Sequence, residues 1–164
     1  METPRVLLLG VGNILLSDEG FGVAAVERLE RDYVWPDTVR LLDGATQGLM
    51  LMPDIMDCDL LVVLDVVLGP EAPGTIYLLE GEDLRRSLSF RDSMHQTDLV
   101  DTLVSCELAG HRPHAVVFGI QPRDWQTLSP ELTPELEARL PEFCAKVVAE
   151  LGRRGIRAAP RAAS

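Results

Sequence analysis

Uninterrupted apolar runs alternate with segments of helical periodicity along most of the chain. The runs at 6–9 and 60–64 contain no polar residue, which is typical of strands buried on both faces of a parallel sheet. Apolar-rich segments at 38–42, 75–79 and 115–120 predict further strands. We therefore expect an α/β fold, a three-layer sandwich in which a mostly parallel, twisted sheet carries helices on both faces.

Helical periodicity predicts helices over about 18–32, over about 97–109 and from Thr133 onward. Ser17 or Asp18 is expected to cap the first of these helices. The last helix begins with a Thr-Pro pair, in which threonine would be the cap and proline would occupy the first turn. Pro141 lies within its apolar stripe, so a kink is expected there.

The composition fits one globular domain. The 164 residues are 46% hydrophobic and 25% charged, and we expect one domain at 1–157 followed by a flexible tail at 158–164. Lys and Arg number 15 against 26 Asp and Glu, a net charge of −11, which disfavours nucleic acid and membrane surfaces as partners. The chain lacks a signal-peptide pattern and an apolar stretch of the roughly 20 residues that a bilayer requires. A soluble, cytoplasmic protein is expected.

Several common chemistries find no support in the motifs. Cys58, Cys106 and Cys144 are widely spaced and form no Cys-x-x-Cys pair, so free thiols in a reducing compartment are expected. No Gly-x-Ser-x-Gly elbow is present. The segment Gly-Val-Gly-Asn at 10–13 lacks the third glycine of a dinucleotide site, because Leu15 stands there. We expect no organic cofactor and attribute these glycines to a close approach of the backbone.

Acidic residues follow three of the predicted strands. Glu19 follows the loop after the first strand, Asp43 ends the second, and Asp65 directly follows the apolar run at 60–64. In open α/β sheets, sites form outside the carboxyl ends of the strands, where these three side chains would gather. Each also has a local explanation: a first-turn glutamate for Glu19, an Asp-Gly turn for Asp43 and a helix cap for Asp65.

A nitrogen ligand could come from His95, His111 or His114. His95 stands just before a predicted helix, near the edge of the sheet, whereas His111 and His114 flank a proline in a loop before a strand. One imidazole with two carboxylates is a suitable ligand set for nickel, zinc or manganese. Spacing alone leaves the choice of metal open.

Six blocks of the sequence carry a family resemblance, and they lie at 9–23 (LGVGNILLSDEGFGV), 42–48 (LDGATQG), 63–66 with 73–75 (VLDV and PGT), 93–96 (SMHQ), 119–122 (GIQP) and 128–132 (LSPEL). In this order they resemble the motifs of hydrogenase maturation proteases. The resemblance extends over roughly 6–151. Its second block reads Gly-Ala-Thr-Gln-Gly where some members have Gly-Gly-Thr, a difference that could adjust substrate fit.

The resemblance implies an α/β sandwich and a specific activity. Such a protease makes one cut that removes the C-terminal extension of a nickel–iron hydrogenase large subunit after nickel has been inserted. By resemblance, Glu19, Asp65 and His95 would contact the nickel, which the precursor carries and the enzyme touches only transiently. Glu19, Asp43 and Asp65 are the implied catalytic acids, in keeping with the family's classification among aspartic endopeptidases. The precursor is the implied partner, and a monomer is expected.

Three points stay open at this level. Either a carboxylate or the metal could activate the hydrolytic water. A non-catalytic module that checks nickel loading on the same precursor would use the same ligands without cutting. A spore-type germination protease is a third possibility, which the short chain disfavours.

Overall fold

A single five-stranded sheet organises the protein. The computed structural model describes residues 3–45, 48–81 and 94–162. In spatial order the strands are β3 (Val39–Ala45), β1 (Val6–Val11), β4 (Leu60–Val66), β6 (His114–Ile120) and β5 (Ile76–Glu80). The first four are parallel, and only β5 runs antiparallel to its neighbour. The expected mostly parallel α/β sheet is confirmed, and the structure adds the strand order.

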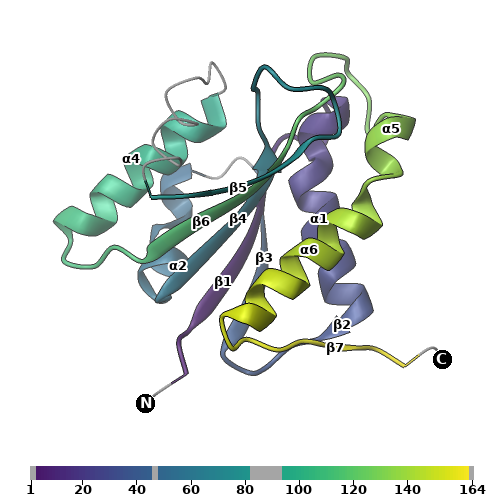
Figure 1. Cartoon of the computed structure of the whole chain (residues 1–164). Coiled ribbons are helices and arrows are strands. Elements are labelled where there is room, and N and C mark those ends of the chain that lie inside the picture. Colours follow the sequence, from purple (N-terminus) through teal and green to yellow (C-terminus); the bar gives the residue numbers. More distant parts are fainter. Residues whose placement is uncertain (1–2, 46–47, 82–93, 163–164) are drawn as a thin grey trace.

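Helices cover both faces of this sheet (Figure 1). One face packs against α1 (Phe21–Asp32) and α6 (Leu140–Arg153), the latter preceded by the short α5 (Pro134–Glu137). The other face packs against η2 (Gly48–Leu51), α2 (Met52–Met56) and α4 (Met94–Leu108). None of the helices in the described part of the chain is long and apolar enough to cross a membrane.

The apolar runs of β1 and β4 serve two separate cores. Leu8 of β1 belongs to the core under α1 and α6, whereas its neighbours Leu7 and Leu9 belong to the core under α2 and α4. On the first side, Phe21 meets Phe143 edge to face, with ring centroids 4.9 Å apart, and neither side chain has exposed surface. Since successive side chains of a strand point to opposite faces, two covered faces require a run without polar residues.

Two glycines bring α1 directly onto the sheet. A Cβ at Gly22 would lie 2.1 Å from the carbonyl oxygen of Leu64 and 2.6 Å from that of Val11. A Cβ at Gly10 would lie 2.4 Å from the carbonyl oxygen of Gly22. These contacts leave no space for a side chain, so the glycine-rich segment serves close backbone packing, as its sequence indicated.

The start of α1 differs from its prediction. A short 3-10 helix, η1 (Ser17–Gly20), precedes α1, and the N-cap of α1 is Gly20 without a side-chain hydrogen bond. Neither Ser17 nor Asp18 caps α1, so that prediction is wrong. The physical reason is that the Asp18 carboxylate binds a distant loop instead, as described below.

Two features near the C-terminus also differ. The predicted last helix is divided into α5 and α6, where Pro141 predicted only a kink. The physical reason is that proline lacks an N–H and occupies the first turn of a new helix, α6. In place of a flexible tail from residue 158, β7 (Ala159–Pro160) pairs with β2 (Tyr33–Val34). The backbone N–H of Arg161 also donates to the Asp32 carbonyl oxygen over 2.9 Å, so this segment is held against the end of α1.

Candidate functional site

Asp65 is a buried carboxylate near the carboxyl end of the central strand β4. Its exposed fraction is 2%, and it is the penultimate residue of the strand rather than the residue after it. The backbone N–H of Val66 donates to Asp65 Oδ1 over 2.7 Å, which holds the carboxylate at the end of the strand. Val63, two residues earlier in β4, belongs to the core under α2 and α4. Since alternate residues of a strand share a face, Asp65 turns to that same face.

Glu19 and Asp65 both border Gly12, Glu19 through its backbone and Asp65 through its carboxylate. Glu19 lies in η1 with 5% of its surface exposed. A Cβ at Gly12 would lie 1.9 Å from the Glu19 carbonyl oxygen and 3.9 Å from Asp65 Oδ1. Gly12 also has a φ of 133°, a conformation that favours glycine. The glycine thus lets the segment that carries Glu19 fold over the end of β4, which brings two acidic residues to one edge of the sheet.

Asp43 lies at the same edge but on the other face. In the parallel register, Gly10 of β1 is flanked by Asp43 on one side and Leu64 on the other. Asp43 therefore alternates to the face of Leu64, which packs under α1 and α6, whereas Asp65 faces α2 and α4. Asp43 is exposed and two strands from β4, about 9–10 Å at the usual strand spacing. The sequence predicted three acidic residues at one edge of the sheet. The strand register shows that Asp43 lies on the opposite face from Asp65.

His95 is the second residue of α4, not a loop residue before it, because the helix begins at Met94 instead of about residue 97. The chain runs from α4 into β6, which is parallel to β4, so the first turn of α4 lies at the carboxyl-end edge of the sheet (Figure 1). The helix covers the face to which Asp65 turns. The placement of the His95 side chain lies outside what the structure describes.

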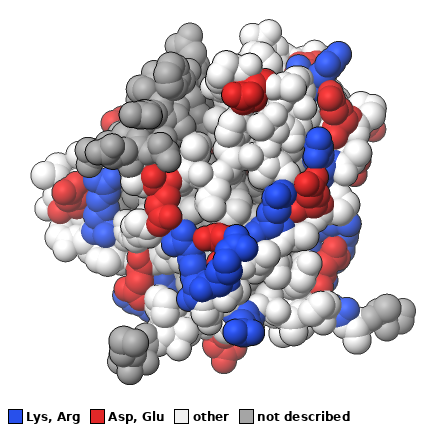
Figure 2. Space-filling view, viewed as in Figure 1, with Lys and Arg blue, Asp and Glu red and all other residues white. Residues whose placement is uncertain are grey.

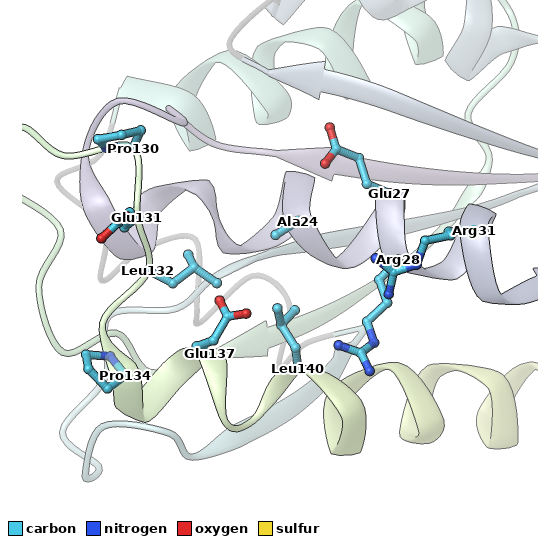
Figure 3. A pocket seen from close by; sticks show the side chains of 10 residues that line it. All are labelled: Ala24, Glu27, Arg28, Arg31, Pro130, Glu131, Leu132, Pro134, Glu137 and Leu140. Carbon is cyan, nitrogen blue, oxygen red and sulfur yellow. The ribbon is translucent and has the colours of Figure 1, made fainter.

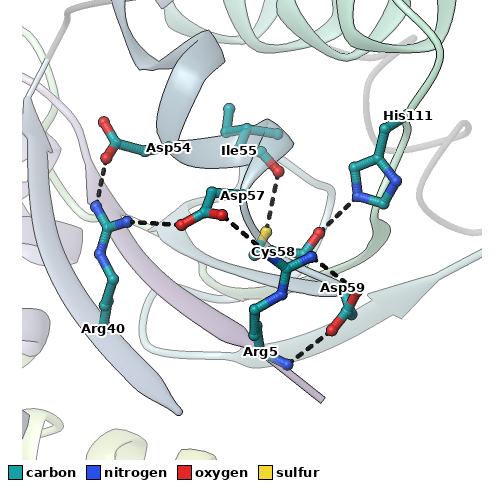
Figure 4. Close-up of polar contacts among 8 residues, drawn as sticks. All are labelled: Arg5, Arg40, Asp54, Ile55, Asp57, Cys58, Asp59 and His111. Carbon is teal, nitrogen blue, oxygen red and sulfur yellow. Dashed lines mark hydrogen bonds and ion pairs between the residues drawn. The ribbon is translucent and has the colours of Figure 1, made fainter. Parts of the chain in front are cut away.

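His111 has a structural partner at the opposite edge of the sheet. Its ring Nε2 donates to the carbonyl oxygen of Cys58 over 2.7 Å (Figure 4). Nearby, Arg5 pairs with Asp57 at 2.9 Å and with Asp59 at 3.5 Å. These ion pairs are solvent-exposed and contribute little stability individually. They lie at the amino ends of β1 and β4, far along the strands from Asp65.

His114 is an ion-pair partner as well. It contacts Glu80, which also binds Arg154 at 2.9 Å, and both partners hold the pKa of the Glu80 carboxyl down at about 2, with the hydrogen bond from Arg154 as the larger cause. On the face of the molecule shown in Figure 2, basic side chains generally lie beside acidic ones. Among the side chains that the structure describes, no three His, Cys, Asp or Glu groups come together as metal ligands. The His95 side chain is not one of those described.

Asp18 forms a clamp that the sequence did not reveal. Its carboxylate is fully buried and accepts hydrogen bonds from the backbone N–H groups of Arg123 and Asp124, both at 3.0 Å, and of Thr133 at 2.8 Å. Thr133 is the N-cap residue of α5, as predicted, but its hydroxyl makes no cap hydrogen bond and donates to the Asp18 carboxylate instead. Asp18 thereby fixes the loop at 121–133 against η1 and holds the backbone next to Glu19. No local sequence pattern identifies this clamp, because its partners lie 105 to 115 residues away.

Cysteine chemistry does not suit this fold. All three cysteines are free and buried, and burial raises the pKa of Cys58 to about 12 and that of Cys144 to about 11. The pKa of Cys106 is raised for the same reason. Because the thiolate is the nucleophile, buried neutral thiols are unreactive.

A separate groove of about 720 Å³ lies between α1 and the segment at 130–140 (Figure 3). Its walls carry both signs of charge, including Arg28, Arg31 and Glu137. None of the acidic residues at the sheet edge lines it. The buried carboxylates therefore identify the edge above β1 and β4, rather than this groove, as the candidate site.

Comparison with known proteins decides the family. A sequence model of the hydrogenase maturation proteases matches residues 23–150. The chain belongs to the hydrogenase maturation protease family. The match includes the positions of Asp43, Asp65 and His95 and begins after Glu19. Membership makes the chain a protease with a role in hydrogenase maturation.

Individual relatives match nearly the whole of this chain. The hydrogenase 2 maturation protease of Escherichia coli is 39% identical over 163 residues, 97% of this chain and 98% of that protein. The hydrogenase expression/formation protein HupM of Azotobacter chroococcum is 38% identical over 162 residues, 98% of this chain and 78% of that protein. The structure of the hydrogenase maturating endopeptidase HybD of E. coli superimposes with a TM-score of 0.90 at 38% identity, covering 96% of this chain and 98% of HybD.

Proposed function

We propose that this maturation protease removes the C-terminal extension of a nickel–iron hydrogenase large subunit after nickel insertion, and that Glu19, Asp65 and His95 contact the nickel of the substrate. The observation that carries this proposal is that Glu19 and Asp65, both nearly fully buried, border the same glycine, Gly12, at the carboxyl-end edge of the sheet. Asp and Glu are seldom this deeply buried, so two of them at the edge where α/β sheets form their sites favour a functional role.

The ligand types suit the proposed contact. Two carboxylates and one imidazole are appropriate donors for a borderline dication such as nickel. Asp65 faces α4, and the first turn of α4, which carries His95, begins at the same edge. We propose that the metal arrives with the precursor and leaves with the product, so that these residues align the scissile peptide by holding the substrate's own nickel.

Hydrolysis then needs an activated water. Glu19 or Asp65 could accept its proton, or the substrate's nickel could acidify it, and both routes place the water at the same edge. Asp43 remains the third candidate acid, consistent with an aspartic-type mechanism, although it faces away from Asp65. Free, buried thiols fit a reducing compartment, and we propose that the chain acts in the cytoplasm as a monomer.

Mass spectrometry of the precursor tests this function. The large-subunit precursor of the host organism, with and without nickel, is incubated with the chain and its mass is measured. Loss of a C-terminal peptide from the nickel-loaded form alone is the expected result. A precursor that binds the chain but keeps its full mass in both forms would refute the protease activity and favour a nickel-checking chaperone.

Variants then separate the proposed roles. Glu19→Gln, Asp65→Asn and His95→Ala are each expected to abolish cleavage of the nickel-loaded precursor while the fold is retained by circular dichroism. Asp57→Asn, at the opposite edge of the sheet, is the matched control and should cleave normally. Full turnover by the His95 variant would remove that residue from the mechanism. Asp43→Asn reports whether an acid on the other face takes part.

A further inference from the structure

Large apolar side chains are exposed in loops beside the candidate site. Ile14, Leu15 and Leu128 have exposed fractions of 51%, 54% and 78%. We call these three the apolar rim. Ile14 and Leu15 lie in the loop between β1 and η1, and Leu128 lies in the loop after β6. Both loops leave the sheet at its carboxyl-end edge. Single exposed apolar residues are ordinary, but a group at one functional edge suggests a contact surface.

The two loops of the apolar rim are joined by backbone hydrogen bonds. The N–H of Ser129 donates to the Leu15 carbonyl oxygen, and the N–H of Ser17 donates to the Ser129 carbonyl oxygen, both over 2.8 Å. The Leu15 N–H is in turn bound by the side-chain oxygen of Asn13 at 2.9 Å. Leu15 and Leu128 are therefore presented side by side on a fixed backbone rather than on independent loops.

The same loops are anchored at the site itself. A Cβ at Gly20 would lie 3.1 Å from the Ile14 Cα, so Ile14 rests on η1, which contains Glu19. The Asp18 clamp ties η1 to the loop that carries Leu128. Because the backbone is held at both ends, these side chains cannot fold into the core without breaking these hydrogen bonds. Only a partner can remove them from water.

We propose that the apolar rim is the docking surface for the protein substrate, receiving apolar side chains of the hydrogenase large-subunit precursor next to its scissile peptide. This inference rests on the proposed function. A protease must hold a polypeptide beside its catalytic groups, and the rim continues directly from the segment that bears Glu19. Burial of apolar surface is the dominant favourable term in most protein–protein association.

Steady-state cleavage of the nickel-loaded precursor tests the docking surface. Leu128→Ser is the main variant, and Ile14→Ser combined with Leu15→Ser is the second. Leu108→Ser is the matched control, since Leu108 is 84% exposed but lies at the end of α4, near the amino-end edge of the sheet. Urea denaturation establishes that each variant is folded, which the high exposure of Leu128 favours.

The expected result is a rise in KM of about tenfold for Leu128→Ser and for the double variant, with kcat within about a factor of two of wild type, because an interaction made equally in the ground and transition states affects KM alone. Leu108→Ser should match wild type. Unchanged KM in both rim variants, or an equal rise in the Leu108 control, overturns the docking surface. A wild-type chain that leaves the precursor intact instead refutes the proposed function, and the docking surface with it.

Discussion

Replacing Asp18 with asparagine should destabilise the protein strongly although it changes only one atom. The carboxylate has no exposed surface, and its two oxygens serve different partners. Oδ2 accepts from the backbone N–H groups of Arg123 and Asp124, and Oδ1 accepts from the N–H of Thr133. In asparagine, one of these oxygens becomes an NH2 group, which cannot accept a hydrogen bond.

The loss of stability is set by the more favourable of the two orientations that the asparagine amide can take. With the amide oxygen toward Arg123 and Asp124, the NH2 group faces the Thr133 N–H, and one charge-assisted hydrogen bond, worth about 1.5–3 kcal/mol, is lost. The two remaining bonds weaken to neutral strength, about half as strong. The Thr133 hydroxyl can rotate to accept from the new NH2 group, which offsets part of the loss. We expect a decrease of about 3 kcal/mol in the free energy of unfolding.

Urea denaturation followed by circular dichroism measures this decrease. A folded variant is still expected, because domains of this kind have about 5–15 kcal/mol of stability. Asp57→Asn, whose side chain is 60% exposed in surface ion pairs, is the control and should unfold at nearly the wild-type urea concentration. If Asp18→Asn lowers stability by less than about 1 kcal/mol, the carboxylate does not clamp the loop at 121–133 and the reasoning from buried donors is wrong.

Three further outcomes follow from particular contacts. Gly22→Ala should cost about 3 kcal/mol or more, since its Cβ would lie 2.1 Å from a backbone oxygen, whereas Gly152→Ala, which meets nothing within 4 Å, should not lower the melting temperature. Glu80 has its pKa lowered from 4.5 to about 2, so its stabilisation is full above 4.5 and lost as pH falls towards 2; the urea midpoints of wild type and Glu80→Gln should converge as pH falls from about 5 to about 2. Burial raises the pKa of the Cys144 thiol to about 11, so a thiol reagent at about pH 8 should modify it only after unfolding, and rapid reaction in the native protein would contradict its burial.

Local patterns were sufficient for the five strands of the main sheet and drew attention to Glu19 and Asp65. Apolar runs without polar residues identified β1 and β4, because a strand covered on both faces cannot afford polar side chains in its middle. The same rule made Asp65 conspicuous at the end of such a run. The glycine spacing around Gly12 indicated close backbone packing, since only glycine permits it. These inferences depend on neighbours in sequence, which is why the chain alone could support them.

Relations between distant segments were decided only by the tertiary structure. Asp18 looked like a helix cap, yet its partners lie 105 to 115 residues away, and no local pattern records such a contact. The face to which Asp43 turns depends on its register with β1, a pairing of separate strands. The hydrogen bond that gives His111 its structural role joins it to residue 58. The sequence by itself determined the buried strands and the acidic residues near their carboxyl ends. Long-range packing determined which of these residues come together, because hydrogen bonds and strand pairing act through space rather than along the chain.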